Sequence, residues 1–162
     1  MRLPGKSISP EQVIRRAKTN SSGCVATYVG LIRSISHGKQ VVSVEYQDNS
    51  GKAVEGLRKI VDEAKQKWPV ENIAFTHRIG KLKVGDINLE VAVAAGHLVE
   101  GFAACQYIIN RFKESLPTHK IETYSDGITL DNNSKYPELN LTLIPQFHGH
   151  NNVRLLLVAI IL

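Results

Sequence analysis

Between residues 52 and 114 the apolar side chains follow a helical spacing, then an alternating one, then a helical one again. In the stretches 52–68 and 98–114 apolar residues recur every three or four positions, which predicts two long helices that each bury one face. The stretches 73–79 and 87–95 place an apolar residue at every second position, which predicts two strands. This region alone restricts the chain to a mixed architecture. The stripe predicted to be buried on the second helix consists of Leu98, Phe102, Cys105, Ile108, Ile109 and Phe112.

The segments on either side extend this pattern. Ser9-Pro10 begins a short helix, because serine caps a helix and proline fits its first position. Residues 24–33 and 41–46 are rich in β-forming side chains, and we expect them to pair as a hairpin with a long polar connection. Residues 119–124 form one more predicted strand. The order of elements predicts an α+β fold with largely antiparallel sheets and three main helices.

The charge balance favours anionic partners. Lysine and arginine number 20 and aspartate and glutamate number 15, which gives a net charge of +5 and a pI near 9.3. The basic residues are spread along the chain, so no disordered nucleic-acid-binding arm is predicted. Phosphate, carboxylate and nucleic acid all remain candidate partners at this point.

Cysteine usage and the chain ends indicate a cytoplasmic protein. Cys24 and Cys105 are far apart in the sequence, and each lies within an apolar pattern, so we expect two buried free thiols in a reducing compartment. Residues 1–6 lack the apolar region of a secretory signal. The apolar run 155–162 is too short to span a bilayer.

Several common catalytic motifs are missing from the sequence. Gly80-Lys81 does not belong to a phosphate-binding loop, because neither the required first glycine nor the final Ser or Thr is present. Neither G-x-G-x-x-G nor G-x-S-x-G occurs. His148 and His150 are two histidines without a third ligand, which is weak support for a metal site. We therefore expect no metal and no cofactor.

Two lysines flank a proline near the end of the second long helix. Lys113 lies in the last helical turn, Pro117 stops the helix, and Lys120 follows on the strand 119–124. A helix end and a strand start joined by a short turn can bring both ammonium groups to the entrance of one pocket. This arrangement suits an anion, or a lysine that acts as acid or base. The alternative is that Lys113 only complements the helix dipole in solvent.

Three further side chains occur where predicted elements end. Arg33 ends the first strand, and its planar guanidinium suits a phosphate or carboxylate. His97 lies just before a helix N-terminus, where free backbone N–H groups attract anions. Together with His77 and the two lysines, they suggest a basic pocket. His77 itself is on the apolar face of its strand, and we interpret it as a hydrogen-bonded core histidine.

Five segments occur in an order and spacing that resemble the large, catalytic subunit of molybdopterin synthase. They are Tyr28-Val-Gly-Leu-Ile-Arg33, Val44-Glu-Tyr46, His77-Arg-Ile-Gly-Lys-Leu-Lys-Val-Gly85, Val91-Ala-Val-Ala-Ala-Gly-His97 and Lys113-Glu-Ser-Leu-Pro-Thr-His-Lys-Ile-Glu122. The resemblance covers about residues 8 to 130. We therefore expect residues 1–135 to form one domain and residues 136–162 to form a C-terminal tail of uncertain structure.

The resemblance implies an α/β-hammerhead-like fold and a sulfurtransferase activity. Proteins of this family form a homodimer, and each copy binds a small ubiquitin-like sulfur carrier, giving a heterotetramer. The carrier inserts a C-terminal Gly-Gly tail that ends in a thiocarboxylate. Its sulfur is transferred to cyclic pyranopterin monophosphate, which yields the molybdopterin dithiolene during molybdenum (or tungsten) cofactor synthesis.

The resemblance assigns catalytic roles to Lys113 and Lys120, which match the two lysines at the family's reaction centre. Both the carrier tail and the substrate phosphate are anions, so a cationic pocket would hold them together. Our hypothesis places Lys113 against the carrier thiocarboxylate and makes Lys120 the proton donor or acceptor to the substrate.

Four residues are predicted to bind the substrate. Arg33 matches the family arginine after the first strand, and His97 matches the histidine of a His-Arg pair. Tyr28 stands where the family usually has phenylalanine. Leu98 replaces the arginine of the His-Arg pair, which removes one cation from the expected phosphate pocket. His119 and the residues of the C-terminal tail are candidates to supply that charge.

The departures from the family pattern leave an alternative open. Pro117-Thr-His-Lys-Ile-Glu122 stands where the family has Pro-Ile-Trp-Lys-Lys-Glu. A non-catalytic paralogue that binds the carrier or a dimer partner would tolerate such changes, although Lys113 and Lys120 oppose that interpretation. A nucleic-acid-binding protein is a third hypothesis, which rests on the pI alone and lacks an aromatic stacking platform.

Overall fold

The computed structural model describes residues 7–115 and 118–131 of the 162-residue chain. The helices are α1 (Pro10–Ala17), α2 (Ala53–Lys67) and α3 (Leu98–Ser115). The strands are β1 (Cys24–Leu31), β2 (Ile35–Ser36), β3 (Lys39–Gln47), β4 (Val70–His77), β5 (Gly80–Lys83), β6 (Ile87–Ala95), β7 (His119–Tyr124) and β8 (Thr129–Asp131). The predicted α+β class, the antiparallel sheets and the three helices are confirmed.

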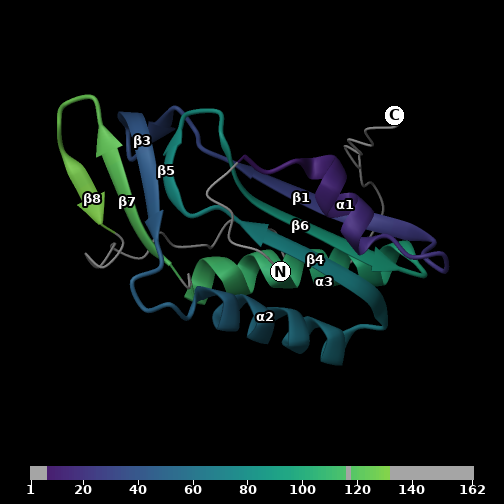
Figure 1. The fold of residues 1–162 in the computed structure, drawn as a ribbon. Helices are drawn as coiled ribbons and strands as arrows, with labels where there is room; N and C mark the ends of the chain where they lie inside the picture. The colour runs from purple at the N-terminus through teal and green to yellow at the C-terminus, as the bar shows by residue number, and fades with distance from the viewer. Residues whose placement is uncertain (1–6, 116–117, 132–162) are drawn as a thin grey trace, which may run out of the picture.

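The first sheet has the antiparallel order β1-β6-β4 and is covered on both faces (Figure 1). Because successive strand residues point to opposite faces, Leu89, Val91 and Val93 pack on the side of α2 and α3. Ala92 and Ala94, which lie between them in β6, pack with residues of α1 on the other side. Burial on both faces explains why β6 carries so few polar side chains.

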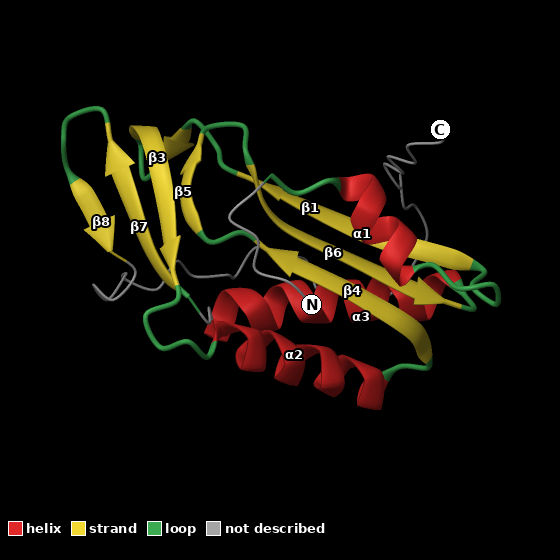
Figure 2. Ribbon diagram, in the orientation of Figure 1, coloured by secondary structure: helices red, strands yellow, loops and turns green. Residues whose placement is uncertain are grey.

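The second sheet stands beside the end of the first (Figure 2). Its order is β2-β3-β7-β8, and β5 also pairs with β3. All of these pairings are antiparallel. The face that packs inward includes Val44, Leu82 and Tyr124, each no more than 2% exposed. Strand β7 begins close to the C-terminal end of α3, and this junction builds the site described below (Figure 1).

The prediction that residues 24–33 and 41–46 pair as a hairpin is wrong. Strand β1 pairs with β6 in the first sheet, and β3 pairs with β5 and β7 in the second. The short strand β2 takes the hairpin position beside β3, through a turn in which His37 and Gly38 both have positive φ. An alternating pattern shows that a strand buries one face, but it does not identify the neighbouring strand.

The first turn of α3 differs from the predicted buried stripe. Leu98 and Phe102 are 55% and 53% exposed, and Gly101 and Ala104 are buried instead. A Cβ atom on Gly101 would lie 3.3 Å from Cys24 Sγ, so the helix uses a glycine to approach β1 closely. Cys105 is buried as expected, whereas Cys24 is half-buried, and both are free thiols.

The short strands β2, β5 and β8 were not predicted, because two to four residues are too few to show a periodic pattern. Across residues 7–115 and 118–131, no helix is long and apolar enough to span a bilayer. The predicted tail at 136–162 and the residues His148 and His150 lie outside the described residues.

Candidate functional site

Lys120 is held by a buried carboxylate. It lies on β7 opposite Tyr46 of β3, and its Nζ donates a hydrogen bond to Glu122 Oε1 at 2.5 Å. Glu122 is two positions further along the same strand, so both side chains point to one face of the sheet. Glu122 is only 4% exposed, whereas Lys120 is partly exposed. The Lys120 ammonium group is therefore held in place by Glu122 and remains partly exposed to solvent.

Glu122 is the centre of a hydrogen-bond network. Its Oε2 accepts hydrogen bonds from the Tyr124 hydroxyl at 2.5 Å and from the Ser36 hydroxyl at 3.0 Å. Arg33 reaches the same network, because its Nη2 donates to Ser36 Oγ at 3.3 Å. Burial by itself raises the pKa of Glu122, but its bonds to Lys120, Tyr124 and Ser36 outweigh this effect. The net pKa lies below the ordinary value, so Glu122 is a carboxylate at neutral pH.

A second polar cluster joins the two sheets beside this network. The Tyr46 hydroxyl accepts a hydrogen bond from Asn88 Nδ2 at 2.9 Å. Burial raises the pKa of Tyr46 to about 12, so the phenol stays protonated. Gly30 lies against this cluster: a Cβ atom at this position would lie 2.7 Å from Asn88 Oδ1 and 3.3 Å from the ring of Tyr28, so these side chains would have to shift. The charge of Glu122 and the Tyr28 hydroxyl both act on Tyr46, which places Tyr28 beside the site.

His77 is a core residue, as the sequence predicted. It is 0% exposed, with Nδ1 2.9 Å from the carbonyl oxygen of Asn88 and Nε2 3.1 Å from Thr118 Oγ1. Its ring makes edge contacts with Tyr46 and Phe112, at centroid distances of 4.7 Å and 5.0 Å. Burial lowers the pKa of His77 to about 4, so the ring is neutral at physiological pH and adds no positive charge to the site.

The segments that carry the two predicted catalytic lysines meet at His77. Lys113 is exposed in the last turn of α3, directly after Phe112, which packs on the His77 ring. Thr118, two residues before Lys120, forms a hydrogen bond with the other side of that histidine. The sequence prediction that a helix end and a strand start come together here is confirmed.

His97 does not join the other cations within one chain. It precedes α3, whereas Lys113 lies in the last turn of that helix. At a rise of 1.5 Å per residue, the 18 residues of α3 span about 27 Å. The single basic pocket predicted from Arg33, His97 and the lysines is therefore corrected: one chain gathers Arg33 and Lys120 and brings in the helix end that carries Lys113.

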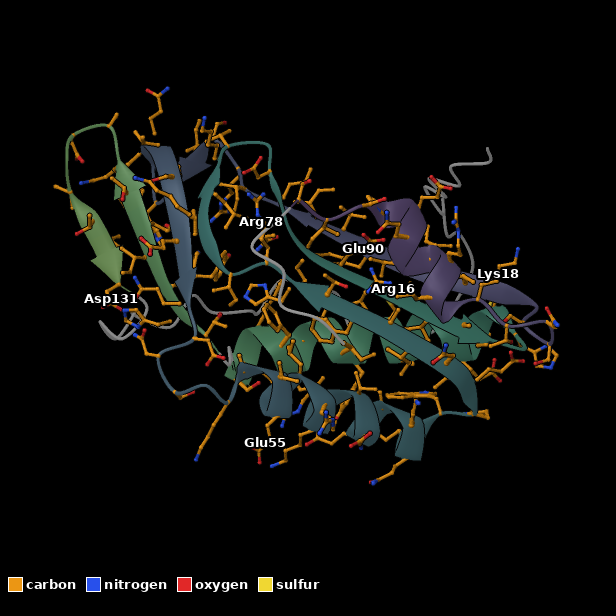
Figure 3. All side chains as sticks on the ribbon, in the orientation of Figure 1. Arg16, Lys18, Glu55, Arg78, Glu90 and Asp131 are labelled. Atoms are coloured by element: carbon orange, nitrogen blue, oxygen red, sulfur yellow. The ribbon has the colours of Figure 1, made fainter. Side chains whose placement is uncertain are left out.

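His119 points away from Lys120, because neighbouring residues of a strand face opposite sides. Its Nε2 lies 2.9 Å from Asp131 Oδ2 on β8, and Asp131 is labelled at the edge of the second sheet in Figure 3. A protonated His119 would be neutralised by this aspartate. The structure thus separates His119 from the position where a cation is missing.

Several residues of the site were missed by sequence reasoning. Ser36, Asn88 and Tyr124 lie far apart in the chain, and no short motif connects them. Glu122 had a signal, since a K-x-E pattern on a strand places both charges on one face. Among the described residues, no group of three histidine, cysteine, aspartate or glutamate side chains could hold a metal ion.

The fold and the site define a class of protein: an α+β domain that presents cationic side chains where a helix end meets a second sheet. The sequence model of the MoaE protein family matches residues 4–115. The chain belongs to this family. The match includes Lys113 and ends before Lys120.

Individual relatives agree with this assignment. The molybdopterin synthase catalytic subunit of Bacillus subtilis is 33% identical over 120 residues, which cover 74% of this chain and 76% of the relative. The crystal structure of molybdopterin synthase from Staphylococcus aureus superposes with a TM-score of 0.72 at 31% identity, over 78% of this chain and 91% of that one. A complex of subunits 1 and 2 of molybdopterin-converting factor from Helicobacter pylori has a TM-score of 0.57 at 14% identity, over 71% of this chain and 75% of that one, and shares the fold.

Proposed function

We propose that this chain is the catalytic subunit of a molybdopterin synthase. It transfers sulfur from a thiocarboxylated small carrier subunit to cyclic pyranopterin monophosphate and so forms the molybdopterin dithiolene. The observation that carries this proposal is the pairing of Lys120 with the buried carboxylate of Glu122, next to the helix end that bears Lys113. Family membership and the relatives named above support the same reaction.

Each cation has a part in the proposed reaction. Lys113 is exposed at the end of α3, so it can meet the thiocarboxylate of an incoming carrier tail. Lys120 exchanges a proton with the pterin side chain as sulfur is added, and Glu122 fixes the position of its ammonium group. Arg33 is exposed and joined to the same network through Ser36, which suits it to the substrate phosphate. Tyr28 borders the pocket.

The carrier and a second copy of the chain are the proposed partners. The Helicobacter pylori relative is a complex of two different subunits, which supports a small-subunit partner here. We propose a homodimer of this chain, and a heterotetramer with two carriers. Because α3 separates His97 from Lys113, we assign His97 to the site of the neighbouring copy. Leu98, Val99 and Phe102 are 53% to 75% exposed next to His97 and would be covered in the dimer. We place the assembly in the cytoplasm.

The test is conversion of cyclic pyranopterin monophosphate by the purified chain with a thiocarboxylated carrier. Wild-type protein should form the dithiolene product, and Lys120→Ala should reduce the rate by about 100-fold, within the range of general acid–base catalysis. Lys83→Ala, at an exposed lysine of β5, is the matched control and should react at the wild-type rate. Full product formation by Lys120→Ala would show that Lys120 is not the acid or base.

Carrier binding separates this function from the alternative of a non-catalytic paralogue. Both proteins would bind the carrier, but only the synthase would form product. A wild-type chain that binds the carrier and forms no dithiolene would favour the paralogue. The replacement of the family arginine by Leu98 would then explain why no product forms.

A further inference from the structure

Thr118 and His77 form a buried contact between the two segments that carry the catalytic lysines. Thr118 is 4% exposed and His77 is 0% exposed, and Oγ1 of the threonine lies 3.1 Å from Nε2 of the histidine. Thr118 directly precedes β7 and lies two residues before Lys120. The His77 ring also touches Phe112, the residue before Lys113.

The contact at Nδ1, the other ring nitrogen of His77, determines which group donates in this hydrogen bond. Nδ1 of His77 lies 2.9 Å from the backbone carbonyl oxygen of Asn88, which can only accept, so Nδ1 carries the hydrogen. The ring is neutral because burial lowers its pKa to about 4. Nε2 is therefore an acceptor, and the Thr118 hydroxyl donates to it. Asn88 in turn holds Tyr46 through its side chain, so this chain of contacts ends opposite Lys120.

We propose that Thr118 is a positioning residue for the sulfur-transfer site: its hydrogen bond to His77 sets where Lys120 stands relative to Lys113. This inference rests on the proposed function. A lysine that must meet a reacting group within hydrogen-bond distance is sensitive to small displacements, and a misplacement of about 1 Å can cost up to about 100-fold in rate.

Thr118→Val tests the proposal because valine keeps the shape of threonine and removes only the hydroxyl. We expect kcat to fall about tenfold while KM for the carrier stays within about twofold, since the change displaces the reacting lysine rather than the docking surface. Thr118→Ser keeps the donor and should restore kcat to within about twofold of wild type. Thr123→Val, in the strand β7 that follows Thr118, is the matched control, and it should leave kcat unchanged.

Two measurements on the protein without substrate test the same contact. The nitrogen NMR resonance of His77 Nε2 should shift in Thr118→Val and not in Thr123→Val, because only the former removes its donor. Hydrogen exchange at the backbone amides of residues 119–121 should become faster in Thr118→Val, with the amides of the first sheet unchanged.

A Thr118→Val variant with wild-type kcat would overturn the proposal. So would unchanged exchange at residues 119–121. If the wild-type chain forms no product with a thiocarboxylated carrier, the proposed function fails, and the exchange measurement alone then decides whether Thr118 positions the start of β7. Faster exchange confined to residues 119–121 would support that role even in this case.

Discussion

Among the residues that the structure describes, two glutamates are buried, and they differ in almost everything else. Glu122, in the second sheet, is 4% exposed, and its two oxygens accept hydrogen bonds from Lys120, Tyr124 and Ser36. Glu90, in β6 of the first sheet, is 0% exposed, and among the described residues neither of its oxygens has a hydrogen-bond partner. The first has a pKa below its ordinary value, and the second has a pKa raised to about 7.

The surroundings of Glu90 explain its raised pKa. It lies between Val29 and Thr76 on the neighbouring strands, and the Thr76 hydroxyl is also buried without a partner among the described residues. Figure 3 shows Glu90 and Arg16 on the α1 side of the first sheet. Burial raises the pKa of Glu90, and the charge of Arg16 opposes this effect only in part.

The comparison teaches that burial alone does not determine the state of a carboxyl group. Where a lysine and two hydroxyls converge on it, the group stays ionised and holds the lysine in place. Where a buried carboxyl has no hydrogen-bond partner among the described residues and only the charge of Arg16 offsets its burial, ionisation is unfavourable and costs stability. Glu122 belongs to the candidate functional site. Glu90 lies under α1 and makes the stability of the fold depend on pH.

The largest expected effect comes from removing the charge of the satisfied carboxylate. Glu122→Gln leaves Lys120 without its anionic partner, so we expect product formation to fall about 100-fold. The free energy of unfolding should fall by about 2 kcal/mol, because a buried ion pair is broken from one side. Denaturant unfolding and the conversion assay measure the two effects. If Glu122→Gln keeps the wild-type stability and the wild-type rate of product formation, Glu122 has no role in the site.

Removing the charge of Glu90, which has no hydrogen-bond partner among the described residues, should raise the free energy of unfolding rather than lower it. The folded-state pKa of Glu90 is raised to about 7 from 4.5, so its ionisation penalty is absent below pH 4.5, grows as pH rises from 4.5 to about 7, and stays constant above that. We expect Glu90→Gln to raise the free energy of unfolding by about 2 kcal/mol at pH 8, and to gain less at pH 5. A destabilised Glu90→Gln at pH 8 would contradict this.

The pH dependence of the two variants sharpens the contrast. Because the folded pKa of Glu122 is lowered, its contribution to stability is present above pH 4.5 and is lost as pH falls through the folded value. The difference between wild type and Glu122→Gln should therefore shrink in acid, whereas the difference for Glu90→Gln should shrink as pH falls from 8 to 5. When unfolding is measured between pH 8 and pH 5, only the Glu90→Gln difference should change, whereas the Glu122→Gln difference should hold until the pH falls below about 4.5.

A smaller effect is expected from one donor of the Glu122 network. Tyr124→Phe removes the hydroxyl bonded to Glu122 Oε2 and keeps the buried ring. We expect a loss of about 1 kcal/mol in the free energy of unfolding, because the Ser36 hydroxyl still serves that oxygen. Thermal unfolding measures it, and a loss as large as that of Glu122→Gln would show that the network depends on Tyr124 alone.

The smallest effect concerns Arg16. Arg16 carries the charge that, among the described residues, opposes the raised pKa of Glu90, and Arg16→Met removes this charge and keeps a long side chain. The pKa of Glu90 should rise further, and the free energy of unfolding at pH 8 should fall by about 0.5 kcal/mol. In the Glu90→Gln background the same change should have no effect. An equal loss in both backgrounds would assign the role of Arg16 to packing.

The elements of the fold were largely predictable, and their pairing was not. Both long helices and β7 followed from apolar periods that end at proline or glycine signals. The partner of β1 did not, because its alternating side chains fit either sheet. The length of α3 could have been used to separate His97 from Lys113, since the rise of a helix is fixed.

Of the two buried glutamates, only Glu122 had a sequence signal. Its position two residues after Lys120 predicts a shared face. Glu90 alternates with Leu89 and Val91, so it resembles a solvent-facing residue of a half-buried strand. Only the packing of α1 over that face shows that it is buried, and packing between distant segments is not visible in a local pattern.

The most direct test of the role of Glu122 is a double-mutant cycle on single-turnover product formation at saturating carrier. The variants are Lys120→Ala, Glu122→Gln and the two together. If Glu122 acts by holding Lys120, the double variant should react no more slowly than Lys120→Ala alone, because the glutamate has nothing left to position. If the two losses multiply, Glu122 and Lys120 act independently, and the coupling between the buried carboxylate and the reacting lysine is contradicted.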